Sequence, residues 1–513
     1  MRTGPLYQRA GISLLLLSLL CTAGCYKEQV TTEPKEWLVS GRVLEFDQVY
    51  VFADHRDRML LYTLSSDTVP SFMPLVNFGD YDAVSFNGQE LTNEEVNDLG
   101  EVRINHPYPI VAQNSKGTET FQLYFTNLPL LHIHSEYRIR DEPKVLSWSE
   151  LQYVTEDARG RRTAGYTSYT GIEIRGRTSA QLEKKSYGLE LWENVYQKDH
   201  SAPLLGMRNG EDWILDAMYI DKLRMRNKLS FELWEKMWSQ RTETPWPITP
   251  PGIHCKYVEL FINHRYMGLY CLSEKLDESL INLSGNPSSG EGVLYKAIDW
   301  TGGATAFESY NSPPPESMIW EGWEQIYPDN FFYWEPLSEL RKSVVLDEDE
   351  LFIEKIDSLV DLDCLAEYYL FVNLILAHDN IIKNYYLARY PEQSRFLVLP
   401  WDLEGSWGIM WHGGMSSSNG LLENNLYKRL LELNVGEFQE RLESKWETYR
   451  ESLFQLDSLM APTIFYTDLL ERSGAIDREN ARWEDAEIDL DQERLYFTEW
   501  IRLRLNYLDQ VLD

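Results

Sequence analysis

Two acids and one amide in the chain are spaced as a metal-assisted phosphoryl-transfer site requires. The stretch His378–Tyr386, HDNIIKNYY, holds Asp379 and Asn384, and Asp402 follows at the end of a short apolar run. Phosphoryl transfer needs a carboxylate to orient the attacking hydroxyl and oxygen ligands for Mg²⁺. The alternative is an Asx turn that ends a helix, with Asp402 as a turn or cap residue.

A second polar cluster could supply the phosphate contacts. Its basic members are Arg175, Arg177, Lys184 and Lys185, and its small residues, in a turn between two expected strands, are Gly176, Thr178 and Ser179. Small turn residues let backbone N–H groups approach phosphates, and a lysine adds a point charge. The alternative is a solvated basic turn, since one glycine does not make a glycine-rich loop.

The bulk composition excludes some classes of partner. The 513 residues carry a net charge of −33 with a pI near 4.7, and 43% of them are hydrophobic, enough for substantial cores. Such an acidic chain is a poor candidate for binding nucleic acid or an anionic lipid surface, both of which need basic residues. The 17 Trp and 31 Tyr either pack in cores and strands or form a platform for glycans or peptides.

The N-terminus has the pattern of a sorting signal. Arg2 and Arg9 precede an apolar run, Gly11–Ala23, that is too short to span a bilayer. The run leads into the sequence TAGC, which ends at Cys25 and resembles a bacterial lipobox. We expect residues 1–25 to be a lipoprotein signal peptide with Cys25 as the lipid-modified residue.

This anchor would place the protein in the cell envelope, at the outer membrane or cell surface of a diderm bacterium. Residues 26–36 would be the linker to the first domain, and the membrane would be contacted through the lipid alone. An ordinary signal peptide with an incidental cysteine is the alternative.

The remaining cysteines predict little chemistry. They are Cys255, Cys271 and Cys364, an odd number with no zinc-site spacing. A bridge between Cys255 and Cys271 across an expected hairpin is conceivable, but we favour buried free thiols.

The first half of the chain is predicted to be rich in strands. Short alternating segments between Asp, Asn, Gly and Pro residues indicate a small β-sandwich over residues 37–127. Residues 128–282 should form a second β-rich unit, with a helix from about Lys222. Its segment 256–276 reads as a hairpin that turns at Asn263-His264-Arg265.

The second half is predicted to be helical. Residues 283–345 contain many Gly, Ser and Pro residues and read as a loop-rich connector, followed by a helical unit over 346–513. Within this unit, 361–378 should be a helix capped by an Asp, and 395–402 a short strand. The fold class is therefore α+β, with two lobes and a cleft between them.

Six stretches of the chain resemble the spore coat protein H (CotH) kinase family of atypical protein kinases. They read IEIRGRTSA…EKKSYGLEL, DWILDAMYIDKLRMRNKLSFEL, YVELFINHRYMGLYCLSEKLD, LYKAIDW, HDNIIKNYYL and VLPWDLEGSWG. The resemblance spans roughly residues 128–513, and its motifs recur in order. The preceding sandwich resembles the immunoglobulin-like module that often precedes this domain in bacterial surface lipoproteins.

The resemblance implies a protein-kinase-like two-lobed fold that binds ATP and phosphorylates Ser or Thr. Asp379 matches the catalytic residue, and Asn384 and Asp402 match the ligands of Mg²⁺ or Mn²⁺. The residues implied to bind the nucleotide are Arg175, Gly176, Arg177, Thr178, Ser179, Lys184, Lys185 and Glu274. Either lysine could face the phosphates, Arg177 replaces the usual Asn, and Glu274 is expected near the hinge between the lobes.

Three functions remain open at this stage. The favoured one is an ATP- and Mg²⁺- or Mn²⁺-dependent Ser/Thr protein kinase on a lipid-anchored envelope protein, with a protein as its substrate and no nucleic-acid partner. Because ATP is scarce outside the cytoplasm, a catalytically weak or inactive surface, adhesin or structural envelope protein is the alternative. A glycan-binding envelope module that uses exposed aromatic residues is the third.

Overall fold

The computed structural model describes residues 41–158, 160–241, 252–283, 292–390 and 395–512. The expected signal peptide, Cys25 and most of the segment before the first strand lie outside these residues. No helix within them combines the length and the apolarity needed to span a membrane.

The first part of the described chain contains two main sheets around one apolar core. One sheet has the order β2-β1-β6-β9, comprising β1 (Leu44–Phe46), β2 (Val49–Tyr50), β6 (Leu75–Phe78) and β9 (Glu95–Val96). The other has the order β3-β4-β12-β11-β7-β8, comprising β3 (Phe52–Asp54), β4 (Met59–Thr63), β7 (Ala83–Phe86), β8 (Gln89–Glu90), β11 (Tyr108–Asn114) and β12 (Gly117–Thr126). Two short strands, β5 (Thr68–Val69) and β10 (Val102–Arg103), pair with each other. Strand β11 alternates buried and exposed residues, as a strand with one face on a core must.

A closed seven-stranded barrel follows this sandwich. Its order is β13-β14-β15-β16-β19-β21-β20, and only the β13–β20 pair that closes it is parallel. The strands are β13 (Leu130–His134), β14 (Val145–Asp157), β15 (Gly160–Arg175), β16 (Ser186–Trp192), β19 (Asp212–Asp216), β20 (Cys255–Ile262) and β21 (Arg265–Glu274). A separate apolar cluster, which includes Leu131, Ile133 and Leu260, fills it. Two short strands, β17 (Ala202–Pro203) and β18 (Asn209–Gly210), lie in the connection from β16 to β19.

The predicted hairpin is present in this barrel as β20 and β21. Its two turn residues, Asn263 and His264, have φ values of 49° and 58°, which a tight two-residue turn between twisted strands requires. Arg265, which we expected in the turn, is instead the first residue of β21. Cys255 and Cys271 lie on these two strands and are buried free thiols, as is Cys364.

The expectation of a loop-rich connector over 283–345 is wrong in part. This segment contributes β22 (Val293–Ala297), β23 (Ile319–Trp320) and β24 (Trp323–Tyr327) to a five-stranded sheet of order β23-β24-β22-β25-β26. The other two strands, β25 (Tyr385–Arg389) and β26 (Leu397–Pro400), come from the expected helical unit. The Gly and Pro content of the segment hid these strands, because β23 has only two residues and β22 pairs with β25, which is distant in the sequence.

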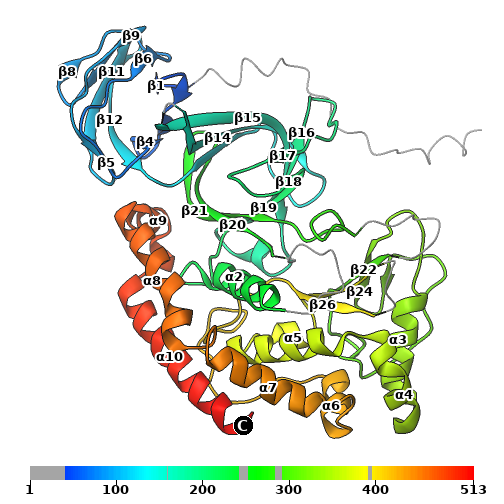
Figure 1. Ribbon diagram of the computed structural model, residues 1–513. Coiled ribbons are helices and arrows are strands. Elements are labelled where there is room, and N and C mark those ends of the chain that lie inside the picture. The colour runs from blue at the N-terminus through cyan, green and yellow to red at the C-terminus, as the bar shows by residue number, and fades with distance from the viewer. Residues whose placement is uncertain (1–40, 159, 242–251, 284–291, 391–394, 513) are drawn as a thin grey trace, which may run out of the picture.

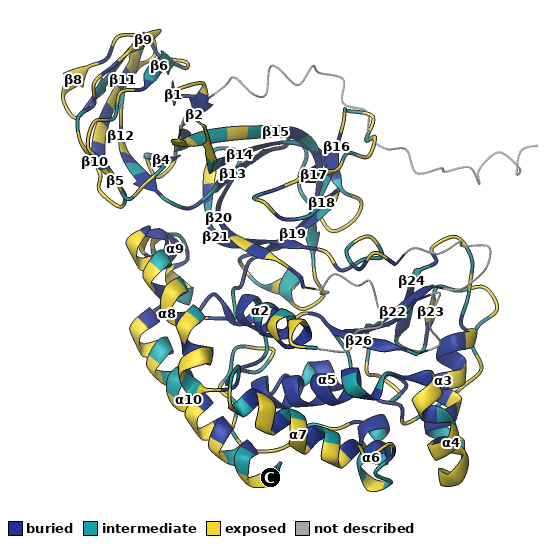
Figure 2. Ribbon diagram, in the orientation of Figure 1, coloured by how far each residue is buried: buried dark blue, intermediate teal, exposed yellow. Residues whose placement is uncertain are grey.

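Helices cover this sheet and connect it to the barrel. They are α2 (Arg226–Ser239), α3 (Glu335–Val345), α4 (Asp349–Leu359), α5 (Leu362–Ile375), α6 (Asn425–Glu432), α7 (Phe438–Arg450), α8 (Leu456–Arg472), α9 (Ala475–Arg482) and α10 (Leu490–Val511). Helix α5, whose N-cap Asp361 accepts a 2.7 Å bond from the Cys364 amide, packs on β26 and is buried along its length (Figure 2). Figure 1 shows α8, α9 and α10 along one side of the molecule, where α9 contacts β21 of the barrel.

The chain is therefore a mixed α and β protein whose β-rich part contains a closed barrel. The sandwich lies at one side of the barrel, and the five-stranded sheet with its helices lies at the other (Figure 1). Barrel closure was not predicted, because it depends on the pairing of β13 with β20 across more than 120 residues.

Candidate functional site

Neighbouring ends of two strands bring Asn384 and Asp402 together. Strands β25 and β26 are antiparallel with Tyr385 opposite Pro400, so Asn384 precedes one strand where Asp402 follows the other. The Asn384 Nδ2 group donates a hydrogen bond of 3.3 Å to Asp402 Oδ2. Both residues have positive φ values, 56° and 54°, a conformation that Asn and Asp tolerate better than most residues.

Asp379 lies in the loop that leads from α5 to this strand end. Helix α5 ends at the left-handed residue Leu376, and Asp379 begins a single 3₁₀ turn, η2 (Asp379–Ile381). Its carboxylate is partly exposed and forms an ion pair of 2.9 Å with Lys383. The expected acid and amide therefore lie on one short loop, with the acid paired to a lysine of the same motif.

Asn380 holds this loop in place, a role that the sequence did not reveal. Its buried Nδ2 group donates hydrogen bonds to the carbonyl oxygens of Asn384 at 2.8 Å and of Trp401 at 2.7 Å. It therefore connects the two segments that carry the candidate metal ligands. The available signal was its place between Asp379 and Asn384 in the motif.

Two cations lie beside Asp402, and the sequence predicted only one of them. The Arg175 guanidinium, at the end of β15, lies 5.9 Å from the centre of the Trp401 ring. The Lys296 ammonium, on β22, lies 5.5 Å from the ring centres of both Trp401 and Tyr386. Sequence reasoning missed Lys296 because a single lysine in an apolar strand forms no cluster with its neighbours in the sequence.

We call the surroundings of Asp402, with Asn384, Arg175 and Lys296, the recess. The charged groups of the recess shift one another's pKa values. Burial and the positive charge of Arg175 lower the pKa of Lys296 to about 8, whereas Glu324 and Asp402 oppose the shift. Burial among protein atoms, followed by the charge of Asp216, raises the pKa of Asp402, which Arg175 and Lys296 oppose. Because the Asp402 side chain is nevertheless open to solvent, it lies in a recess that is crowded by protein but accessible.

The turn after β15 requires its glycine. Gly176 has a φ of 96°, and a Cβ atom on it would lie 1.9 Å from Ser179 Oγ. Thr178 is exposed, and the exposed Arg177 guanidinium lies 3.6 Å from the carboxylate of Asp299, two residues after β22. The expected nucleotide loop thus extends from the barrel to the five-stranded sheet.

Lys184 and Lys185 do not face Asp402 or the turn at Gly176. The fully buried Lys184 ammonium forms an ion pair of 2.6 Å with Glu479 of α9 and donates to the carbonyl oxygen of Leu269. Lys185 donates to the carbonyl oxygens of Ala180, at 2.8 Å, and Leu182. Both ammonium groups are therefore bound within the protein, which differs from the expectation that one faces the phosphates.

Glu274 is also bound within the protein. Its fully buried carboxylate accepts hydrogen bonds from the backbone N–H groups of Arg208 and His254, both at 2.8 Å, and lies 2.9 Å from His254 Nδ1. Glu274 is the last residue of β21, and both oxygens of its carboxylate are occupied by these bonds, so neither is free to contact a ligand. We therefore assign Glu274 a structural role rather than the expected nucleotide contact.

Two further acids adjoin Asp402 and were not expected. Asp216, at the end of β19, accepts a 3.1 Å hydrogen bond from Asn227 of α2, whose own side-chain oxygen accepts the Leu403 amide at 3.0 Å. Burial, and then the charge of Asp216, raises the pKa of Glu404 well above its usual range. Oxygen Oε1 of Glu404 is buried without a hydrogen-bond partner within the described part of the chain.

The oxygen atoms of this recess suit a hard cation. Asn384 and Asp402 provide an adjacent amide and carboxylate, and the unpartnered oxygen of Glu404 lies on the same segment. Across the described ranges, these acids do not form a group of three with ligand atoms within 4.8 Å of one another. Mg²⁺ would therefore keep water and phosphate oxygens as further ligands, which is its usual behaviour in phosphoryl-transfer sites.

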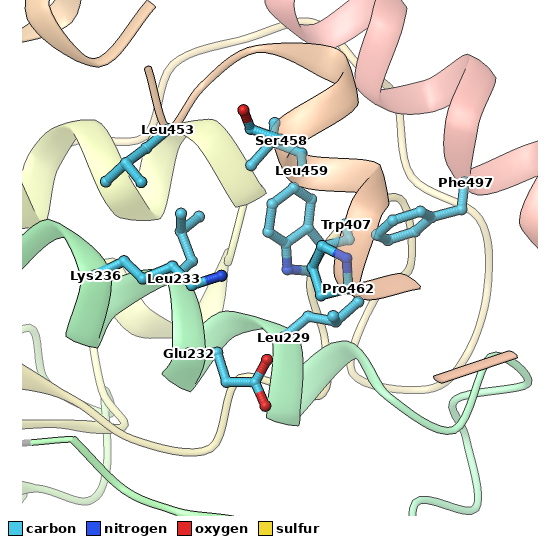
Figure 3. A pocket seen from close by; sticks show the side chains of 10 residues that line it. All are labelled: Leu229, Glu232, Leu233, Lys236, Trp407, Leu453, Ser458, Leu459, Pro462 and Phe497. Atoms are coloured by element: carbon cyan, nitrogen blue, oxygen red, sulfur yellow. The ribbon is translucent and has the colours of Figure 1, made fainter. Parts of the chain in front are cut away.

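An apolar cavity of about 220 Å³ lies elsewhere, between α2 and α8. Figure 3 shows its lining, in which the ring of Trp407 faces that of Phe497 with their centres 5.5 Å apart. None of the acids or cations described above lines it. The indole N–H of Trp407 also donates to Ser230 Oγ of α2 at 2.8 Å, so this cavity belongs to the packing of the helices.

Comparison with known proteins assigns the chain to a family. The model of the family described as CotH kinase protein matches residues 172–508, about two thirds of the chain. The chain belongs to this family. The match includes every acid and cation of the recess and excludes the sandwich and the first two barrel strands.

A relative of known name supports the assignment. The inner spore coat protein H of Bacillus subtilis (strain 168) is 23% identical over 299 residues, which cover 57% of this chain and 74% of the relative. At this identity the comparison supports membership of the family, and the activity of this chain must be argued from its own residues.

Proposed function

We propose that this protein is an ATP- and Mg²⁺- or Mn²⁺-dependent Ser/Thr protein kinase of the CotH type. The observation that carries the proposal is the contact of 3.3 Å between Asn384 and Asp402, on the same side of the five-stranded sheet as the Asp379 loop. An amide and a carboxylate held together in an acidic recess, with a further carboxylate on the adjoining loop, are the groups that metal-assisted phosphoryl transfer requires.

Asp379 would act on the substrate hydroxyl. Its carboxylate is accessible, so it can accept a hydrogen bond from a Ser or Thr side chain. It would take up the hydroxyl proton as the oxygen bonds to the γ-phosphorus of ATP and the bond from that phosphorus to the bridging oxygen breaks, which releases ADP. The Lys383 ammonium, 2.9 Å away, would hold this carboxylate in position. Asn384 and Asp402 would hold the cation, which when bound neutralises phosphate charge.

Lys296 and Arg175 would bind the phosphates, in place of the lysine pair that the sequence suggested. Both act electrostatically on Asp402, and no ion pair of either is present within the described residues. In a partly desolvated recess such cations stabilise charge on a transferred phosphoryl group more strongly than they would in water. The Gly176–Ser179 loop would cover the nucleotide with backbone N–H groups.

We place the kinase domain in the bacterial cell envelope, on the basis of the lipobox-like sequence that ends at Cys25. The second candidate is a surface or coat protein that uses the same fold for binding without transfer. It is supported by the name of the relative, a spore coat protein, and by the ion pair that already neutralises Asp379.

Phosphoryl transfer from radiolabelled ATP tests the proposal. The purified protein is incubated with Mn²⁺ or Mg²⁺ and a Ser-rich protein, beside Asp379→Asn and Asp402→Ala. We expect label transfer that both variants abolish, while Asp357→Asn, a change at an exposed acid of α4, leaves it intact. Absence of transfer by the unaltered protein, with retained binding to an envelope or coat fraction, would favour the second candidate.

A further inference from the structure

Three histidines from two segments meet where the barrel faces the sandwich. His132 and His134 alternate with Leu131 and Ile133 on β13, and because the two apolar residues fill the barrel, the two histidines face outward. His264 reaches them from the turn between β20 and β21. One ring nitrogen of each histidine lies within 4.8 Å of the others.

The hydrogen bonds of this cluster leave several ring nitrogens without partners. His132 Nε2 accepts the backbone N–H of His264 at 3.0 Å, which holds the turn against β13. Both ring nitrogens of His264 are buried and have no hydrogen-bond partner within the described residues, and Nε2 of His134 is buried with only the Glu150 carboxylate, at 3.7 Å, beside it. Buried polar atoms are rarely left so, and each needs an explanation, such as a bound ion.

We propose that His132, His134 and His264 bind one divalent transition-metal ion, with Zn²⁺ as the best match. Imidazole nitrogens suit Zn²⁺ and its neighbours in the first transition series, whereas Mg²⁺ prefers the oxygen atoms of the recess described above. Three protein ligands leave a fourth position for water. The site is distinct from the kinase site in its ligand chemistry and in its place in the fold.

A carboxylate lies next to the His134 imidazole, as is usual around metal-bound histidines. Glu150 Oε2 lies 3.7 Å from His134 Nε2, and Glu150 Oε1 is held by Arg42 at 2.6 Å. Such an outer carboxylate at one ring nitrogen orients the imidazole and raises its basicity, so His134 would bind the ion through its other nitrogen, Nδ1.

The bound ion would hold the β20–β21 turn against β13, on the face of the barrel that meets the sandwich. The His55 ring, on the sandwich, lies 5.5 Å from that of His264, and an apolar cluster beside it joins Phe52 and Leu61 of the sandwich to Leu130 and Phe261 of the barrel. Figure 2 shows β13 at this boundary. Since the family model begins at residue 172, His132 and His134 lie outside the matched region.

Cobalt spectroscopy on the full chain tests the metal site. The protein is purified without a histidine tag, stripped with a chelator, and titrated with Co²⁺ in excess Mg²⁺, which occupies oxygen-ligand sites. We expect one Co²⁺ per chain with the intense visible absorption of a four-coordinate nitrogen site, and its loss on addition of one equivalent of Zn²⁺.

Two variants and a control decide the ligands. His134→Gln and His264→Gln should each weaken Co²⁺ binding at least about 100-fold. Removal of a residue that only supports a ligand costs up to about this much, and removal of the ligand itself should cost more. His412→Gln, at an exposed histidine of another loop, should not change it. Because His264 lies in a turn, its variant should stay folded, which metal-free thermal unfolding checks. Weak octahedral absorption by the native protein, or absorption that neither variant changes, would overturn the proposal and leave the kinase proposal untouched.

Discussion

The Lys184 ammonium lies 2.6 Å from the Glu479 carboxylate, although 295 residues separate them in the sequence. Both side chains are buried, and Arg224 approaches the same carboxylate at 3.1 Å. The Glu479 carboxylate also accepts the Leu269 amide of β21 at 2.7 Å. This group therefore joins α9 to the barrel and occupies one of the two lysines that the resemblance implied at the nucleotide.

Removal of the Glu479 charge should destabilise the fold. Glu479→Gln leaves Lys184 and Arg224 buried without a counter-charge, so we expect the free energy of unfolding to fall by about 3–5 kcal/mol. Urea unfolding measures this change, with Glu484→Gln, at the short turn after α9, as the control. If Lys184 instead bound the nucleotide, Lys184→Met would abolish ATP binding in protein that remains folded, and Glu479→Gln would have little effect on stability.

Replacement of Lys296 should weaken the use of ATP without unfolding the protein. Loss of one charged phosphate contact costs about 1.5–3 kcal/mol, so Lys296→Met should lower kcat/KM for ATP by about 10- to 100-fold. Steady-state kinetics with varied ATP measures this effect. Lys355→Met, at a lysine of α4 that pairs with Asp347, serves as the matched control. An unchanged kcat/KM for Lys296→Met would remove this residue from the phosphate site.

Asn380→Asp should loosen the loop that carries Asp379. The substitution keeps the shape but replaces the Nδ2 donor with an acceptor that faces the carbonyl oxygens of Asn384 and Trp401. We expect a loss of about 2–4 kcal/mol in stability and, in protein that remains folded, a fall in kcat larger than any change in KM. Asn506→Asp, at an exposed position of α10, should change neither. A fall in stability with normal kcat would mean that the hydrogen bonds of Asn380 serve the fold alone.

The His254–Glu274 pair should make stability depend on pH. Hydrogen bonding to Glu274, opposed by burial and aided by the charges of Glu274 and Glu235, raises the pKa of His254 to about 9. The pair therefore stabilises the fold fully below the unfolded pKa of about 6.5, and this contribution is lost as pH rises through 9. Because the ring is half exposed, solvent screening limits the effect to about 1 kcal/mol.

Urea unfolding at pH 6 and pH 9.5 measures the pH effect. In His254→Gln the difference between the two pH values should shrink by this amount, since Gln does not titrate. An equal pH dependence in the native protein and the variant would show that the pair contributes no proton-linked stability.

Local patterns predicted the elements whose signals lie within a few residues. The cap at Asp361 and the apolar run after it located α5, and the Asn263-His264 turn located the hairpin β20–β21. The acid and amide of the loop after α5 were also visible in the sequence, because their spacing sets their chemistry. These parts depend on short-range geometry alone.

Long-range pairing hid the rest of the site. Lys296 enters the recess because β22 pairs with β25, with Lys296 opposite Tyr386, and no local signal announces that pair. Similarly, Asp216 and Glu404 meet only because α2 holds Leu403 through Asn227. Charge along a sequence also does not indicate that the Lys184 ammonium, just before β16, is buried beside Glu479 of α9.

Binding of Mn²⁺ with ATP tests the central claim most directly. Electron paramagnetic resonance can count the Mn²⁺ held by the protein–ATP complex, in native protein and in Asp402→Asn, with Asp357→Asn as the control. The account predicts about one ATP-dependent Mn²⁺ per native chain and its loss in Asp402→Asn at unchanged folding stability. Equal ATP-dependent Mn²⁺ binding by native protein and Asp402→Asn would contradict it.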